Sequence, residues 1–544
     1  MHPELNPLSR EESRQSGRAT SRIYSHHLDD QSIYHSQTEF EKPEDDNSDV
    51  ASKDLEAADD RPQTPPLGRE KTHDPNVVTF GGPEDMENPK NWSFRTKWGA
   101  TAIVSAFTFI SPVSSTMVAP ALGKMAEEFG VTKEMEISLM LSIFVLAYAF
   151  GPLVLGPLSE VYGRVPIIQF ANLFYLVWNI ACGFSQTKAQ MIAFRFLSGL
   201  GGSAPLAIGG GVLSDVWAAE QRGKAISLYS LAPLLGPAAG PIAGGFIVGN
   251  TTWRWIFHAT SIVDFLVQIL GLFFLRETYP PKILANKTAR LIQETGNQNL
   301  RSEYDDSDKT IGKILRISLV RPFKLLGTQV IVQVLALYMA YLYGLMYLVL
   351  STFPTLWGKE YHMSIGIGGL NYLSMGLGFF LGAQICAPLN DKIYIRLKAR
   401  NSGKGKPEFR VPLMFVGAIL VPVGLFWYGW SAQHRLHWIM PNIGACIFCA
   451  GSIIGFQCIQ TYIVDSYTRY AASAIGAAAT LRSLAGFGFP LFAPYMYQKL
   501  DYGWGNSVLG FLALVLGVPA PFLLWQYGSK LRARSTFAAG AAPK

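Results

Sequence analysis

Three ionisable side chains lie inside long apolar runs of this 544-residue sequence, namely Arg195, Asp264 and Arg482. A charged group that faces hydrocarbon is costly, so each is expected to face the protein interior, where it is paired or hydrated. Asp264 lies near the middle of its run and could carry a proton, or it could form a structural ion pair with one of the arginines. The sequence leaves both interpretations open, and all three residues are candidates for proton coupling.

Aromatic and amide side chains form a second candidate site. In the run around residue 343, Tyr343 and Tyr347 share one helix face, as do Tyr338 and Tyr341. A pocket of aromatic rings with a few amides would suit a flat or cationic amphiphile. The alternative for each tyrosine is simple packing or a place at the membrane surface. The candidates for substrate binding are Tyr148, Tyr338, Tyr341, Tyr343, Tyr347, Gln457 and Gln460.

A short turn at residues 156–166 carries charges that could act as a conformational latch. Glu160 and Arg164 are four residues apart and can pair with each other or with neighbours, and Asp215 is a plausible third charge. Gly156 and Gly163 would permit close helix approach and a sharp turn. Such a latch would hold one conformation and break in another. The alternative is a loop that only sets topology.

Regularly spaced glycines and prolines predict a hinge in the fifth apolar run. Gly236, Gly240 and Gly244 are four residues apart and would form a smooth groove on one helix face. Pro237 and Pro241 each remove a backbone hydrogen bond and allow bending. The repetition favours a hinge between domains over small-residue packing alone.

The apolar runs themselves predict membrane-spanning helices. Only 16% of the residues are charged, whereas a soluble protein usually carries about 25%. A bilayer crossing takes roughly 20 mostly apolar residues. Such runs lie at 98–121, 137–157, 166–185, 189–212, 225–248 and 255–275, and then at 328–352, 367–388, 411–430, 438–460, 472–493 and 506–527. We therefore expect an all-α membrane protein with twelve transmembrane helices in two six-helix bundles.

The distribution of charge predicts the topology. Beyond the N-terminal tail, segments assigned to the cytoplasm carry 25 Lys and Arg and those assigned to the outside carry 7, which obeys the positive-inside rule with both termini cytoplasmic. Residues 1–87 are rich in Ser, Asp, Glu and Pro and are expected to be disordered, because they cannot bury enough apolar surface to fold. The expected domains are this cytoplasmic tail, an N-terminal bundle at 88–275, a cytoplasmic linker at 276–327, a C-terminal bundle at 328–528 and a cytoplasmic tail at 529–544.

Other chemistries find little support in the sequence. The five cysteines all lie inside apolar runs, where packing is the simplest interpretation. No His cluster or second C-x-x-C pair accompanies Cys446 and Cys449, so no metal site is expected. No Walker A motif is present, which speaks against ATP hydrolysis as a driving force. We expect no enzyme activity, no cofactor and no nucleic-acid partner. Asn250, in a sequon on a short outer loop, is a glycosylation candidate.

Three motifs resemble those of the major facilitator superfamily. The turn at 156–166 resembles the family's loop signature G-x-L-x-D-R-x-G-R-[KR]-P, with Glu160 in place of Asp and with Val161 and Val165 in place of basic residues. Residues 195–202 are similar to the family's R-x-x-x-G-x-G motif, and residues 236–245 resemble the motif of its exporters. The resemblance favours the latch, because Glu160 keeps the charge, although the loss of two basic residues would weaken its anchoring at the membrane surface.

Further motifs narrow the resemblance to the fungal twelve-span drug:proton antiporters. They lie at 88–98, 276–281, 406–412 and 489–492. This resemblance implies proton-coupled efflux of drugs, toxins or a secondary metabolite, powered by a proton gradient, from a monomeric protein of the plasma membrane. The alternatives are a polyamine transporter, a non-transporting substrate sensor with the same fold, and a place in the vacuolar membrane.

Overall fold

The structure is a computed structural model that describes residues 74, 76–82, 84–218, 221–304 and 311–538. The chain divides into two units, Met1–Asp74 and Pro75–Lys544, and the second unit holds every helix and strand described. Most of the predicted N-terminal tail and residues 539–544 of the predicted C-terminal tail lie outside the described residues.

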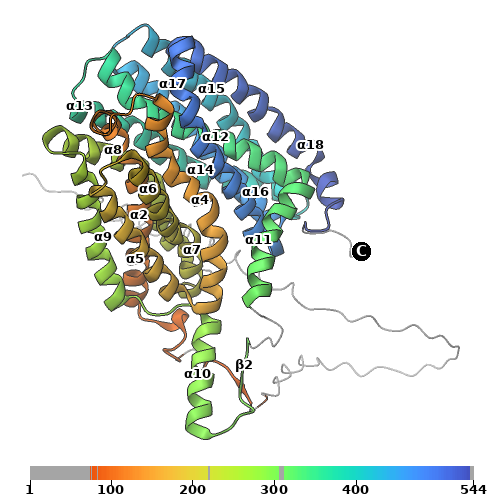
Figure 1. The fold of residues 1–544 in the computed structure, drawn as a ribbon. Coiled ribbons are helices and arrows are strands. Elements are labelled where there is room, and N and C mark those ends of the chain that lie inside the picture. The colour runs from red at the N-terminus through yellow and green to blue at the C-terminus, as the bar shows by residue number, and fades with distance from the viewer. Residues whose placement is uncertain (1–73, 75, 83, 219–220, 305–310, 539–544) are drawn as a thin grey trace, which may run out of the picture. The chain divides into compact units, whose positions relative to one another are not determined.

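The N-terminal half is built from long helices that match the predicted runs (Figure 1). They are α2 (Phe94–Thr116), α3 (Leu122–Glu128), α4 (Glu134–Tyr162), α5 (Arg164–Gly183), α6 (Lys188–Gly202), α7 (Ala204–Val216), α8 (Arg222–Asn250) and α9 (Arg254–Phe274). Helices α6 and α7 meet at Ser203 and together form one span, Lys188–Val216.

The linker and the C-terminal half follow the same plan. The linker holds α10 (Pro280–Thr295), the two-residue strand β2 (Arg301–Ser302) and α11 (Ile311–Thr328). The C-terminal half holds α12 (Val330–Thr355), α13 (Ile365–Leu370), α14 (Tyr372–Arg400), α15 (Pro412–Gln433), α16 (Ile439–Ser466), α17 (Ala471–Gly517) and α18 (Pro519–Ala533). A π-helical turn at Leu356–Glu360 extends α12.

Local sequence signals set several helix ends. The Ser93 hydroxyl accepts a hydrogen bond from the Thr96 amide and caps α2, and Thr187 caps α6 in the same way through the Gln190 amide. Gly296, in the left-handed region at φ 71°, ends α10.

Eleven helical segments of the described chain are long and apolar enough to cross a membrane. The last, Ala471–Ala533, has 63 residues and would be roughly 95 Å long as one straight helix, about three times the hydrocarbon thickness of a bilayer. It breaks at Asp501, where φ is 51°. The Tyr497 hydroxyl donates to Asn506 across this break at 3.1 Å, so the chain turns back on itself there. Two crossings in this segment give the expected twelve.

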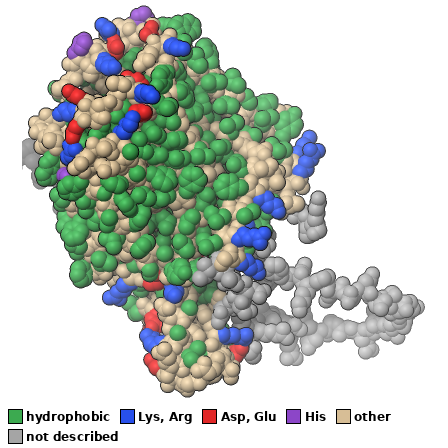
Figure 2. Space-filling model, in the orientation of Figure 1, with side chains coloured by type: hydrophobic (Ala, Val, Ile, Leu, Met, Phe, Trp, Pro, Cys, Tyr) green, Lys and Arg blue, Asp and Glu red, His purple; other side chains and the backbone are tan. Residues whose placement is uncertain are grey.

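Apolar side chains dominate the outer surface of the helices. In Figure 2 they cover the middle of the visible face, and charged side chains gather toward its two ends. On α9 alone, Leu272, Phe273 and Phe274 are each more than 60% exposed. Exposed apolar surface on this scale marks a molecule that lies in lipid. The structure confirms the predicted all-helical membrane fold.

The segment just before α2 is folded, which corrects the prediction that all of residues 1–87 are disordered. The strand β1 (Val77–Val78) pairs in parallel with β2. Asp85 forms an ion pair with Lys287 of α10 at 3.1 Å, and Glu87 forms pairs with Lys287 at 2.8 Å and Arg290 at 3.0 Å. The polar composition hid this order, because the partners of these carboxylates lie about two hundred residues away.

Hydrogen bonds lower the pKa values of both carboxylates in this segment. The Gly81 backbone N–H, followed by Glu87 N–H and Lys287, holds the pKa of Asp85 below its ordinary value. Lys287, with Arg290, does the same for Glu87. A lowered pKa adds stability that is complete above the ordinary carboxyl pKa and is lost as the pH falls through the lowered one. The contact should therefore hold at neutral pH and loosen in acid below about pH 4.

Reversing the charge of Lys287 tests this contact. Lys287→Glu would place a carboxylate beside Asp85 and Glu87, and we expect segment 76–92 to detach from α10. Hydrogen exchange of the amides in 76–82 should become faster in the variant. Lys282→Glu, on the same helix but without an ion pair among the described residues, is the control. Equal protection in the two variants would contradict the proposed role of Lys287.

Candidate functional site

A cavity of about 410 Å³ lies between the two bundles and is called here the central cavity. Its walls come from both halves of the chain, mainly from α8, α12 and α16, with single residues from α2, α4, α7, α14 and α17. Five of the seven predicted substrate-binding residues line it, namely Tyr148, Tyr343, Tyr347, Gln457 and Gln460. Phe379 and Phe456 add further aromatic surface. The volume lies in the range of small-molecule sites, about 300–1,000 Å³.

The other two predicted residues point away from the central cavity. The Tyr341 hydroxyl donates to the carbonyl oxygen of Leu509 in the second half of α17. Tyr338 is 2% exposed, and its ring lies against Gly517. The prediction was wrong for this pair, because the face of α12 that carries them packs against α17.

Arg482 of α17 also lines the central cavity. Its guanidinium lies over the Tyr343 ring, 5.0 Å from the centroid. Its Nε is buried and finds no hydrogen-bond acceptor among the described residues. Neither Asp nor Glu occurs in the described lining of the cavity. The central cavity therefore carries one positive charge without a counter-ion.

Asp264 lies elsewhere, between α5 and α9 inside the N-terminal bundle. It is fully buried, and the Asn172 amide donates to both of its carboxylate oxygens, at 3.1 and 3.0 Å. It forms no ion pair with Arg195 or Arg482 in the described structure, so the structural-pair alternative is wrong. Its role in proton coupling stays a prediction.

Arg195 is a structural crosslink between helices. It is fully buried and donates to the carbonyls of Ser114 and Ser115 at 3.0 and 3.1 Å, and to those of Met140 and Leu141 at 3.3 and 3.4 Å. Ser114 and Ser115 lie in the last turn of α2, whose carbonyls have no partner within the helix. The guanidinium thus joins the end of α2 and the start of α4 to α6, and each of its three nitrogens donates to a backbone carbonyl.

The structure brings together two of the three charges of the predicted latch, and their role as a latch stays a prediction. Arg164 Nε lies 3.4 Å from Asp215, and its Nη1 donates to the Ser159 hydroxyl at 2.8 Å. Gly163 has φ 106°, so the sharp turn does require glycine. Glu160 is exposed and has no ion pair in the part of the chain that the structure describes. Glu160 and Arg164 therefore do not pair with each other, whereas Arg164 pairs with a neighbour, which was the other alternative.

The carboxylate that anchors this turn is Glu277, which sequence reasoning did not assign. It accepts the backbone N–H groups of Arg164 and Val165 at 2.9 and 3.2 Å, and also those of Thr278 and Tyr279. It therefore caps the N-terminus of α5 from a distant segment, where the helix dipole favours negative charge. The Tyr279 ring lies 4.6 Å from the Arg164 guanidinium. Glu277 and Tyr279 both belong to the 276–281 motif, and this motif was the sequence feature that could have identified them as functional residues.

Gly156 does not mediate close packing. A Cβ at this position would meet nothing within 4 Å. The prediction of close helix approach was wrong here, because this side of α4 carries no adjoining backbone.

The predicted hinge residues lie in the unbroken helix α8, which packs against α2 on one face and against α13 of the second bundle on the other. A Cβ on Gly236 would come within 2.7 Å of Pro112, and one on Gly240 within 2.6 Å of Val113, so this face packs closely on α2. Gly244 approaches the Met117 backbone in the same way. The other face meets the second bundle, with Pro241 near Gly369 of α13. The Gly-Pro repeat thus lets α8 lie closely against both halves, and its bending remains a prediction.

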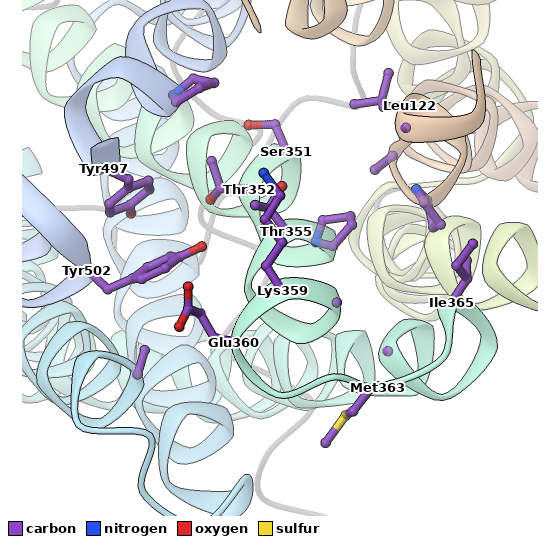
Figure 3. Close-up of a pocket in the computed structure, with 18 of the residues that line it drawn as sticks. Leu122, Ser351, Thr352, Thr355, Lys359, Glu360, Met363, Ile365, Tyr497 and Tyr502 are labelled. Carbon is purple, nitrogen blue, oxygen red and sulfur yellow. The ribbon is translucent and has the colours of Figure 1, made fainter. Parts of the chain in front are cut away.

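A second cavity, of about 800 Å³, lies at the predicted outer ends of the helices and is called here the outer vestibule (Figure 3). Leu122 lies on one side, and Thr355, Lys359, Tyr497 and Tyr502 lie across from it. Sequence reasoning missed this cavity, because its walls come from helix ends of both halves. Between the outer vestibule and the central cavity, the hydroxyls of Ser115 and Tyr347 form a 3.0 Å hydrogen bond that joins α2 to α12.

Two smaller predictions concern single residues. Asn250 is the exposed last residue of α8, and its amide donates to the Phe246 carbonyl at 2.9 Å. Its glycosylation stays a prediction. All five cysteines are free, and four of them are buried. No cluster of potential metal ligands occurs among the described residues.

Comparisons with known proteins agree on one family. A sequence model of the Major Facilitator Superfamily matches residues 104–490. The efflux pump vrtL of Penicillium aethiopicum is 53% identical over 487 residues, which cover 90% of this chain and 96% of that protein. The MFS-type transporter oryF of Aspergillus oryzae is 45% identical over 83% of this chain and 94% of its own length.

Solved structures share the fold at low sequence identity. A bacterial homologue of the human lysosomal transporter Spinster matches with a TM-score of 0.59 and 15% identity, over 81% of this chain and 99% of its own. The xylose transporter XylE from E. coli matches with a TM-score of 0.57 and 15% identity, over 80% and 98%.

A pair of carboxylate substitutions tests the anchoring of the turn. Glu277→Gln removes the charge that holds four backbone N–H groups, and we expect it to cost roughly 1–2 kcal/mol of stability. Glu160→Gln, at an exposed position without an ion pair in the described structure, should have little effect. The midpoint of thermal unfolding of the purified protein measures both. A larger loss in Glu160→Gln than in Glu277→Gln would contradict the assignment.

Proposed function

The chain belongs to the major facilitator superfamily, and from that premise we propose that it is a proton-coupled exporter of small organic compounds. The observation that carries this proposal is the central cavity, which is lined by aromatic rings and amides and lies between two six-helix bundles. A relative named as an efflux pump supports export as the direction. The substrates we propose are drugs, toxins or a secondary metabolite, and the membrane is the plasma membrane, with the vacuolar membrane as the alternative.

In the proposed cycle, the two bundles rock around the central cavity and expose it alternately to each side. Opening toward the outer vestibule requires the Ser115–Tyr347 hydrogen bond to break. On the cytoplasmic side, Arg164 and Asp215 hold the inner ends of α5 and α7 together. Contacts of this kind can exchange as the bundles move, since they are few and their partners lie on different helices.

We assign the coupling proton to Asp264. Protonation would turn one of its two acceptor oxygens into a donor and would disturb the paired hydrogen bonds from Asn172. Because Asp264 does not line the central cavity, the proton would act through the packing of α5 on α9 and would not compete directly with the substrate. The energy source in this proposal is the proton gradient, and no cofactor is needed.

The alternatives are weaker on physical grounds. A polyamine carries several positive charges and calls for carboxylates in its site, whereas the described lining of the central cavity offers Arg482 and no carboxylate. A non-transporting sensor would have no need for the contact between Arg164 and Asp215, which is intact. We therefore retain export as the proposal.

Transport into sealed vesicles tests the proposal. The purified protein is placed in liposomes whose lumen is more acidic than the bath, and a panel of fluorescent drugs and spermidine is followed. We expect the pH gradient to drive accumulation of drug in the vesicles. Accumulation should fall about tenfold or more in Asp264→Asn, because the carboxyl group that carries the coupling proton has been removed. Glu294→Gln, an exposed carboxylate of α10, should transport normally.

The other outcomes are equally informative. Accumulation that is unchanged in Asp264→Asn would support antiport but would show that another residue carries the coupling proton. Movement of spermidine alone would replace the proposal with polyamine transport. No gradient-driven movement of any compound would refute proton-coupled efflux of small organic compounds.

A further inference from the structure

We propose that the substrate is a flat aromatic anion, such as a hydroxylated aromatic carboxylate, and that Arg482 binds its negative charge. This inference rests on the proposed function and names the substrate class of the same central cavity. Four features of the cavity carry it: an uncompensated cation, its unused donor group, an unused acceptor, and aromatic walls.

The first feature is the charge of the central cavity. Arg482 is the one charged residue in its described lining, and the nearest aromatic partner, Tyr343, is uncharged. Opposite charges attract strongly in a cavity of low dielectric constant, and like charges repel equally strongly. A cationic substrate would meet repulsion from Arg482 that tyrosine rings cannot offset. We therefore retain the prediction that the substrate is a flat amphiphile, but not the prediction that it is cationic.

The second feature is the unused donor group of Arg482. The comparison with Arg195 is informative, because that arginine uses all three of its nitrogens on four backbone carbonyls. Arg482 has a buried Nε with no acceptor in the described structure. A buried donor without a partner is costly, and a guanidinium matches a carboxylate through two parallel hydrogen bonds. Arg195 has a structural role, whereas Arg482 is free to bind.

The third feature lies on α16. The Oε1 atom of Gln457 is buried and accepts no hydrogen bond from any described residue. Gln457 and Arg482 line the same cavity. The cavity therefore has a cationic hydrogen-bond donor on Arg482 and a neutral acceptor on Gln457, both without a partner in the described structure. A ligand that carries an anion and a hydroxyl would satisfy both.

The fourth feature is the aromatic surface. Tyr148, Tyr343, Tyr347, Phe379 and Phe456 all line the central cavity. The rings of Tyr343 and Tyr347 lie 5.0 Å apart, and Phe456 packs edge-on against Tyr343 at 6.0 Å. Aromatic walls favour flat rings by stacked and edge contacts. The combined requirement is a flat ring system with one negative charge and a neighbouring hydroxyl.

A matched pair of ligands tests the charge without any mutation. The fluorescent 3-hydroxy-2-naphthoate and its methyl ester share the ring and the hydroxyl, and differ in the negative charge. We expect the full-length purified protein to bind the acid at least about tenfold more tightly than the ester, because the ester loses the charged hydrogen bonds. Equal binding of acid and ester, or no measurable binding of the acid, would overturn the proposal.

Variants of Arg482 locate the effect. Arg482→Gln should abolish the preference for the acid, and Arg482→Lys should keep part of it, since the charge remains. Lys392→Gln removes an exposed cation of α14 outside the cavity and should keep the full preference. A preference for the acid that persists in a folded Arg482→Gln protein would overturn the assignment. If Arg482→Gln does not fold, Arg482→Lys and the acid–ester comparison decide.

The transport assay separates this inference from the proposed function. Accumulation of neutral or cationic drugs, together with equal binding of acid and ester, would keep export and refute the anion. Charge-dependent binding through Arg482, without any gradient-driven transport, would keep the anion site and refute proton-coupled export.

Discussion

Hydrocarbon offers no hydrogen-bond partners, so every buried polar group of this protein must be satisfied within the protein itself. The arrangement of the N-terminal bundle follows from this constraint. Arg195 satisfies carbonyls at the end of α2 and the start of α4. Asn172 pairs with both oxygens of Asp264 and thereby joins α5 to α9. These polar contacts are specific in direction and partner, which apolar packing alone is not, and they set which helices lie side by side.

Several buried polar atoms of the described residues keep no partner, and two of them belong to the lining of the central cavity. Arg482 and Gln457 each keep a buried polar atom without a partner in the described structure, and both lie where a substrate would enter. Unsatisfied groups of this kind reduce the stability of the empty protein and strengthen the binding of a complementary ligand. All three nitrogens of Arg195 donate to carbonyls, whereas Arg482 keeps a buried Nε without an acceptor in the described structure. This contrast divides structural from binding roles more clearly than residue type does.

The cytoplasmic face shows how remote segments control helix ends. Glu277, which follows α9, caps the first turn of α5 beside the latch of Arg164 and Asp215. The helix that Glu277 precedes, α10, also holds segment 76–92 through Lys287. The inner loop of the N-terminal bundle, the linker and the segment before the first span are therefore physically connected.

The sequence by itself determined the membrane fold, the span positions and the sharp turn at Gly163. These features depend on local hydrophobicity and backbone conformation, which neighbouring residues set. It did not determine that Tyr338 and Tyr341 face α17, that Glu160 is unpaired, that Glu277 caps α5, or that residues 76–87 fold. Each of these depends on which segments meet in space, because helices of equal hydrophobicity can pack in many ways. Only the tertiary structure decided which helices supply the hydrogen-bond and ion-pair partners of each polar side chain. It therefore also decided that Arg482 is the charged residue in the described lining of the central cavity and has no counter-ion there.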